Sequence, residues 1–216
     1  MHSAVRLDLD RQNTLRRTLE TSGNDFLGCG AFKTAQRTKL TMSQWDPTIS
    51  SLVPQVGKRV DVASKRFFLE SARGRRRWLP GDEFPRVYAE GNILYWAHVL
   101  LSMVYDYVHH IQTKKGDPPF SMPQVRFVNA AVGLTLRRAV NSKAQFPYST
   151  CLIIEELLHM PDGGFTKFIS NGDAVPLVKM GEDGFEVAEF LSFSQHVQYI
   201  KTGKLVYISD YQGVPK

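Results

Sequence analysis

A long stretch with helical periodicity most constrains the fold of this 216-residue chain. Its apolar residues recur at intervals of three and four, which places them on one helix face: Ile93, Leu94, Ala97, Leu100, Leu101, Val104, Tyr105, Val108 and Ile111. The pattern predicts a helix that begins near Arg86. It ends before Gly116-Asp117-Pro118-Pro119, because glycine and proline stop helices.

Shorter patterns predict the other elements. Apolar and β-branched runs indicate strands at Val60–Leu69, 124–129, Cys151–Glu156 and Lys204–Asp210, and a strand-turn-strand at Asp25–Leu40 with its turn at Gly28 and Gly30. A second amphipathic helix is expected at Glu186–Ile200, with its inner face formed by Val187, Phe190, Leu191, Ser194 and Val197. Residues 1–25 are expected to be a loosely ordered lead-in, and Thr41–Lys58 and Gly74–Pro85 to be loops.

The composition limits the class of protein. The length suits one large domain or two small lobes. The two cysteines, Cys29 and Cys151, are too few for a disulfide framework and do not form a zinc-binding pair. No signal peptide and no membrane-spanning run is recognisable, so we expect a soluble, intracellular, cytoplasmic protein with no membrane partner.

The positive charge is concentrated in the first half of the chain. Residues 1–114 account for the whole formal net charge of +6, and four arginines cluster at positions 73, 75, 76 and 77. Such a cluster can contact phosphate or nucleic acid, or it can be a solvated loop. The arginines are not interleaved with aromatic residues, which favours the loop and argues against a nucleic-acid partner.

Two features of the first half could bind phosphate. Gly28, Gly30 and Ala31 lie between two expected strands, where small residues let backbone N–H groups approach an anion, although a plain hairpin has the same pattern. Lys65 lies within an apolar strand and needs a phosphate, a partner carboxylate or an exposed edge. Glu90 is a candidate partner for it, or an ordinary acid of a first helical turn.

Two segments of the second half could bind a nucleotide. The apolar strand that leads to Glu155, Glu156 and Leu157 has the pattern of a hinge between lobes, or of a strand with a polar end. Lys167 and Asn171 could contact nucleotide or ribose groups, or be solvated loop residues. The six histidines show no metal-ligand spacing, and no nucleophile elbow is present.

The last expected strand ends at an acid, and an amide follows it two residues later. Asp210 and Gln212 are two residues apart, so both side chains share a face if strand geometry continues. A carboxylate at a strand end suits general-base or metal chemistry. The alternative is that Asp210 only caps a turn before Gly213.

Taken in order, these pieces resemble the alpha-kinases, a family of atypical serine/threonine protein kinases. The resemblance runs from about Phe26 to Val214 and rests on the ordered set of glycine turn, strand lysine, long helix, Ile154-Glu155-Glu156, Lys167-Phe168 with Asn171, and Asp210-Tyr211-Gln212-Gly213. It implies an α+β, two-lobed protein-kinase-like fold. Residues 26–157 would form the N-lobe and residues 158–216 a partial C-lobe, after the lead-in at 1–25.

The resemblance also implies roles for individual residues. Gly28, Gly30 and Ala31 would cover the ATP phosphates, which Lys65 would hold. Glu155, Glu156 and Leu157 would surround adenine, with Lys167 and Asn171 as further nucleotide contacts. Asp210 would orient or deprotonate the hydroxyl of a protein substrate, and Gln212 would bind magnesium. Phosphoryl transfer needs positioning and charge neutralisation more than covalent chemistry, which these residue types supply.

The sequence departs from the family after Gly213. The second metal-binding aspartate and the His/Cys zinc module of the family are not found, so we expect an incomplete C-lobe and impaired activity. Two alternatives remain open. One is a non-catalytic, nucleotide-binding pseudokinase, and the other is a basic nucleic-acid-binding module.

Overall fold

The computed structural model describes residues 17–42, 58–120, 122–136, 148–159 and 164–214. The chain divides into two compact units. Unit 1 comprises residues 1–94 and 128–157, and unit 2 comprises residues 95–127 and 158–216. Residues 95–127 thus belong with unit 2, whereas the sequence-based division had included them in the N-lobe. Neither described helix contains a stretch that is both long and apolar enough to cross a bilayer.

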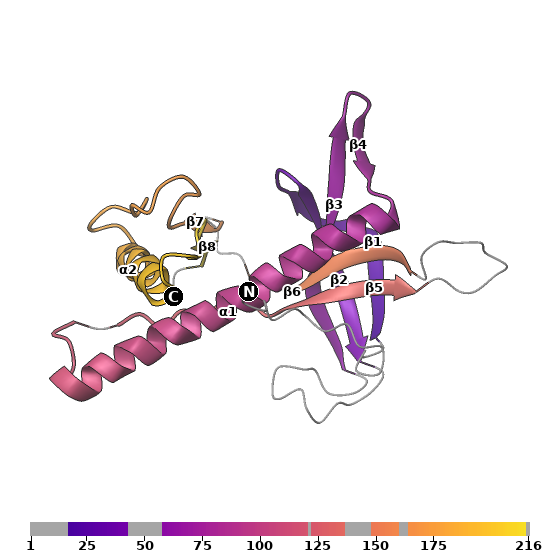
Figure 1. Cartoon of the computed structure of the whole chain (residues 1–216). Helices are drawn as coiled ribbons and strands as arrows, with labels where there is room; N and C mark the ends of the chain where they lie inside the picture. Colours follow the sequence, from indigo (N-terminus) through magenta and orange to yellow (C-terminus); the bar gives the residue numbers. More distant parts are fainter. Residues whose placement is uncertain (1–16, 43–57, 121, 137–147, 160–163, 215–216) are drawn as a thin grey trace. The chain divides into compact units, whose positions relative to one another are not determined.

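A six-stranded sheet dominates unit 1 (Figure 1). Its strands are β1 (Arg17–Cys29), β2 (Lys33–Met42), β3 (Arg59–Ser71), β4 (Gly74–Arg77), β5 (Ala130–Leu136) and β6 (Tyr148–Glu156). The order across the sheet is β1-β2-β3-β6-β5, and β4 pairs with the last residues of β3. All these pairs are antiparallel, so short turns suffice to join β1 to β2 and β3 to β4.

The expected strands within Asp25–Leu40, Val60–Leu69 and Cys151–Glu156 are confirmed. Three other expectations are wrong. β1 begins at Arg17, inside the expected lead-in, and β4 lies in an expected loop. Residues 124–129 form no strand, and β5 follows them instead. The rest of the lead-in, at 1–16, and most of the expected loop, at 43–57, lie outside the described residues.

The long helix, α1 (Pro80–Lys115), begins six residues before the expected start at Arg86. Proline suits the first helical turn because its missing N–H has no intrahelical acceptor there, and acids in that turn favour the positive end of the helix dipole. The C-terminal end is confirmed. Gly116 adopts the left-handed conformation, with φ +83°, and its N–H donates to the carbonyl of Gln112 at 2.8 Å.

The core of unit 1 lies where the first turns of α1 meet the sheet. Val87, Cys151 and Ile153 are almost completely buried there. Partly buried residues surround them: Phe67, Phe84, Leu94, Ala130, Val132 and Leu134. Of the expected inner face of the helix, Ala97, Leu100, Leu101 and Val104 are buried, whereas Ile93 is 59% exposed and was wrongly assigned to that face.

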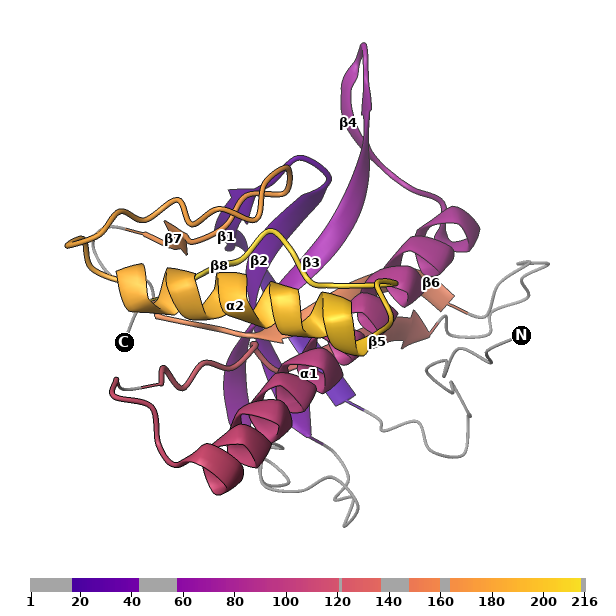
Figure 2. The same cartoon turned by 60° about the vertical axis from the view of Figure 1, so that its left-hand side comes forward.

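Unit 2 is built around the second helix, α2 (Phe185–Lys201), which is confirmed (Figure 2). Ala188 and Leu191 of α2 pack against Phe168 and Tyr211. Those two residues lie at the small antiparallel pair of β7 (Thr166–Lys167) and β8 (Gln212–Gly213). A second cluster joins Phe190 and Val197 of α2 to Leu101 and Val104 of α1. The expected inner-face residue Ser194 is fully buried, and its hydroxyl donates to the carbonyl of Phe190 at 2.7 Å.

Candidate functional site

One face of the unit 1 sheet carries two lysines close together. Lys33 pairs in register with Phe67, and Lys65 lies two residues before Phe67 on the same strand. Because residues two apart share a face of a strand, and directly paired residues share a face of the sheet, Lys33 and Lys65 are on the same side. We call Lys33, Lys65 and the two acids that pair with them, Glu90 and Glu155, the charged face.

Each lysine of the charged face has its own carboxylate. The ammonium of Lys65 forms an ion pair with Glu155 of β6, and that of Lys33 forms an ion pair with Glu90 of α1. The expected pairing of Lys65 with Glu90 is therefore wrong. Cross-strand register explains the result: Glu155 pairs with Ala63, two residues from Lys65, and so projects from the same face.

The charged face is half-buried rather than sealed. The side chains of Lys33, Lys65 and Glu90 are 25–31% exposed, and that of Glu155 is 10% exposed. The ammonium of Lys33 also lies 5.4 Å from the centre of the Phe67 ring, a favourable cation–π distance. The face therefore presents two ordered cations that solvent and a ligand can still reach.

The glycine turn precedes Lys33 directly. Gly30 donates its N–H to the carbonyl of Lys33 at 2.9 Å, which closes the β1–β2 turn. A Cβ built on Gly28 would meet no heavy atom within 4 Å, and one built on Gly30 would meet only the Lys33 carbonyl, at 3.9 Å. Packing within the chain therefore does not require glycine at either position. Ala31 and the neighbouring Phe32 are exposed.

The expected adenine-binding residues lie at the end of β6. The backbone N–H of Glu156 donates to the carbonyl of Asn129 at 2.8 Å, and the Glu156 carboxylate accepts a hydrogen bond from Nδ2 of Asn129 at 3.3 Å. The Glu155 carboxylate is held by Lys65. Leu157 is the first residue beyond the strand. The three residues are thus contiguous with the charged face, and both glutamates already have polar partners.

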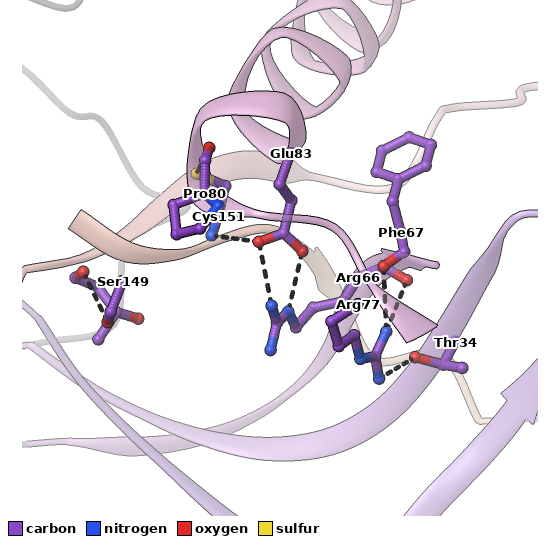
Figure 3. A network of polar contacts seen from close by, with 9 residues as sticks. Thr34, Arg66, Phe67, Arg77, Pro80, Glu83, Ser149 and Cys151 are labelled. Carbon is purple, nitrogen blue, oxygen red and sulfur yellow. Dashed lines mark hydrogen bonds and ion pairs between the residues drawn. The ribbon is translucent and has the colours of Figure 1, made fainter. Parts of the chain in front are cut away.

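A polar network centred on the buried Glu83 includes Arg66, the residue of β3 that follows Lys65 (Figure 3). Arg66 donates from Nε and Nη2 to the carboxylate of Glu83, and Glu83 also accepts the backbone N–H of Cys151 at 3.1 Å. Glu83 is completely buried. Burial, with a smaller contribution from the nearby Glu83 charge, raises the pKa of the Cys151 thiol to about 12. This network ties β3, β6 and the first turn of α1 together.

Unit 2 brings together three of the expected site residues. Lys167 pairs in register with Gln212, and the ammonium of Lys167 forms an ion pair with Asp210. The side chains of Lys167 and Asp210 are 43% and 54% exposed. Asn171 is exposed in the loop after Ser170, whose carbonyl accepts a hydrogen bond from Ser209 at 2.9 Å. That contact brings the loop beside the residue that precedes Asp210.

The expected strand Lys204–Asp210 is wrong, because the backbone is left-handed at both ends of the range. Lys204 has a φ of +69° and Asp210 a φ of +63°. Strand alternation therefore does not relate Asp210 to Gln212, as the sequence had suggested. The two residues are connected instead through Lys167, which is ion-paired with one and paired across the strands with the other.

Two side chains of α2 that were not among the expected site residues hold the backbone two residues before Asp210. The buried side chains of Gln195 and Gln198 bind the backbone of Ile208: Gln195 Nε2 donates to its carbonyl, and its N–H donates to Gln198 Oε1, each at 2.8 Å. Tyr211 is buried and stacks on Phe127, and burial raises the pKa of its hydroxyl to about 12. Amides at positions 195 and 198, on the inner face of an apolar helix, were the signal available in the sequence.

The described residues do not fit a resident magnesium site. They contain no group of three His, Cys, Asp or Glu side chains placed to hold a metal ion. Gln212 offers a neutral oxygen, and the nearby Asp210 carboxylate is held by Lys167. A neutral amide does not hold magnesium without acidic ligands beside it.

Two solved structures resemble this chain. One is the alpha-kinase domain of myosin-II heavy chain kinase A in complex with AMP-PNP, with 17% sequence identity and a TM-score of 0.46 over 92% of this chain and 70% of the other. The second is a catalytic-domain mutant of myosin heavy chain kinase A, with 18% identity and a TM-score of 0.45 over 93% of this chain and 71% of the other. No family model and no curated protein matches the sequence.

Proposed function

We propose that the chain is an ATP-dependent serine/threonine protein kinase of the alpha-kinase type. The nucleotide-binding half of the proposal rests on unit 1, and the phosphoryl-transfer half on unit 2. The observation that carries it is the placement of Lys33, which directly follows the Gly28–Gly30 turn, and Lys65 of β3 on one sheet face.

The charged face suits a polyphosphate. Each of the two ammonium groups can donate hydrogen bonds to a phosphoryl oxygen, because lysine binds phosphate as a compact point charge with three donors. In the ligand-free chain Glu90 and Glu155 hold these groups in position. The open space above Gly28 leaves its backbone accessible to a phosphate, which explains glycine at a position that internal packing does not require.

Asp210 is the proposed proton acceptor. The hydroxyl oxygen of a substrate serine or threonine bonds to the γ-phosphorus, the bond from that phosphorus to the β–γ bridging oxygen breaks, and ADP leaves. The hydroxyl proton passes to the Asp210 carboxylate, which Lys167 orients through its ion pair. This step depends on position and charge, as phosphoryl transfer does in general.

Calorimetric titration with ATP tests the nucleotide half. A charge-assisted phosphate contact contributes roughly 1.5–3 kcal/mol, so we expect Lys65→Ala to weaken ATP binding by about 10- to 150-fold. Lys39→Ala is the matched control, because Lys39 is an exposed lysine on β2, opposite Asp61 and away from the glycine turn. Its affinity should stay within about twofold of the wild type.

A folding control is needed because Lys65→Ala leaves the Glu155 carboxylate without its partner. The double variant Lys65→Met/Glu155→Gln removes both charges and keeps the side-chain volumes. If this variant melts like the wild type and still binds ATP with wild-type affinity, Lys65 has no part in nucleotide binding and the proposal fails.

The second candidate function is a nucleotide-binding pseudokinase. It is favoured by the lack of a metal-holding set among the described residues and by the neutral character of Gln212. A pseudokinase would bind ATP through the charged face but would transfer no phosphate to serine/threonine peptides. Transfer assays on the protein used for calorimetry therefore separate the two functions.

A further inference from the structure

The β3–β4 hairpin carries a second, separate positive feature. Arg73, Arg75, Arg76 and Arg77 lie at its turn and along β4, and all four are exposed. Figures 1 and 2 show this hairpin reaching beyond the other strands of its sheet. Four guanidinium groups within five residues repel one another. An acidic ligand that binds there would relieve this repulsion.

Arg77 anchors the base of the hairpin. Its guanidinium donates to the hydroxyl of Thr34 at 2.7 Å and to the carbonyls of Arg66 and Phe67, each at 3.3 Å (Figure 3). These contacts join β4 to β2 and β3, and Arg66 is fixed in turn by Glu83. These hydrogen bonds fix the base of the hairpin, from which Arg73, Arg75 and Arg76 project.

Within the part of the chain that the structure describes, the other three arginines form no ion pair. Arg75 lies over the ring of Phe68, at 4.9 Å from its centre, and no described residue forms an ion pair with Arg73, Arg75 or Arg76. Arg75 and Arg76 are adjacent on a strand and so project from opposite faces of the ribbon. Arg75 shares its face with Arg77 and with Glu70, its register partner on β3, and Arg76 projects from the opposite face, so each face of the hairpin carries arginine.

The local aromatic residues argue against a nucleic-acid ligand. Single strands bind where bases can stack on aromatic side chains. Here the ring of Phe68 is covered by Arg75, and the ring of Trp78 is covered by Arg86 at 3.9 Å. The rings stabilise the guanidinium groups and are not available to bases.

The strand edge favours a polypeptide ligand. β4 pairs with β3, and no other described strand pairs with β4, so an extended peptide has an edge along which to lie. In an extended peptide successive side chains point to opposite faces, so consecutive acids would meet arginines on both faces.

We infer that the β3–β4 hairpin is a docking site for an extended acidic polypeptide segment, rich in consecutive Asp or Glu. The docking site requires neither ATP nor phosphoryl transfer. Its test is therefore independent of the test of the proposed kinase activity. The competing explanation is that charged side chains on a short exposed strand only prevent edge-to-edge association.

Fluorescence anisotropy of the full chain with labelled deca-glutamate tests the inference, with deca-glutamine as the neutral probe. We expect saturable binding of deca-glutamate, no binding of deca-glutamine, and weakening with salt because exposed charges are screened. Arg73→Gln/Arg76→Gln should lower the affinity at least about fivefold. Arg73→Lys/Arg76→Lys, which keeps the charge, should retain most of the binding.

The matched control is Arg37→Gln/Arg59→Gln, which removes the same charge from residues paired with Asp61 and Glu20 elsewhere in the sheet. Its affinity should stay within about twofold of the wild type.

An equal loss of affinity in the two double variants would show that only the net charge matters, and would overturn the inference of a docking site. No binding of deca-glutamate by the wild type would leave edge protection as the role of the arginines. Tighter binding of labelled oligothymidylate, lost in Arg73→Gln/Arg76→Gln, would assign the hairpin to nucleic acid instead.

Discussion

The guanidinium of Arg66 donates two hydrogen bonds to the carboxylate of Glu83, at 3.1 Å and 3.0 Å. The acid is completely buried in the first turn of α1, and the arginine is on β3, directly after Lys65. Loss of either partner would leave the other as an uncompensated charge next to the core of unit 1.

We expect Glu83→Ala to lower the free energy of unfolding by about 3–5 kcal/mol, because it leaves Arg66 unpaired and the Cys151 N–H without its acceptor. Urea denaturation followed by circular dichroism measures the loss. Asp82→Ala is the control, since Asp82 is an exposed acid in the same helical turn, and it should change stability only slightly. Equal losses in the two variants would show that helix-dipole effects, and not the buried pair, explain the result.

The left-handed backbone at Asp210 allows a test of its chemical role without damage to the fold. Asparagine tolerates a positive φ better than other residues that carry a side chain, so Asp210→Asn should fold and bind ATP like the wild type. It should lose phosphoryl transfer to serine/threonine peptides, because an amide does not accept the proton. Undiminished transfer by this variant would exclude Asp210 as the proton acceptor.

Alkaline pH should destabilise the protein in two steps. Burial holds the pKa values of Cys151 and Tyr211 at about 12, above the values of 9.0 and 10.0 that apply to the free groups. The folded state therefore keeps protons that the unfolded state loses, and the free energy of unfolding should fall by about 1.4 kcal/mol per pH unit for each group, from about pH 9 and pH 10 upward.

Urea titrations at pH 8 to 11.5 measure this slope. Tyr211→Phe removes the hydroxyl and Cys151→Ala removes the thiol, so each should make the dependence on pH shallower. A slope that neither substitution changes would mean that other groups cause the alkaline loss.

We expect the side chain of Gln198 to contribute to the stability of unit 2 through its hydrogen bond with the backbone of Ile208. Gln198→Leu keeps the volume but leaves the half-buried Ile208 N–H without its acceptor, which costs about 1–3 kcal/mol. Hydrogen exchange should quicken at the Ile208 amide more than along α2. His196→Ala, at an exposed position of the same helix, should leave that amide protected.

Periodicity was sufficient to predict both helices, because each buries one apolar stripe. It was not sufficient for the start of α1. Pro80, Gly81 and Pro85 are typical of loops, yet a proline is well placed at the beginning of a helix, and the buried pair of Glu83 with Arg66 holds that turn. Such a pair depends on the tertiary structure and leaves no periodic signal.

The members of the candidate site could be listed from the sequence, but their partners could not. Pairing of Lys65 with Glu155 depends on the register between β3 and β6, which residues far apart in the chain determine. Lys33 was missed as a site residue because a single lysine after a turn looks solvated. The strand expected to reach Asp210 failed because the positive φ values at Lys204 and Asp210 break the alternation.

The two cysteines of the chain occupy opposite environments. Cys151 is completely buried, and its thiol has a pKa of about 12, so it is protonated and shielded at neutral pH. Cys29 is exposed at the end of β1, beside Gly30 in the glycine turn. A maleimide dye added to the folded wild-type protein should therefore label Cys29 selectively. The label gives a fluorescent reporter at the proposed phosphate site without any engineered residue.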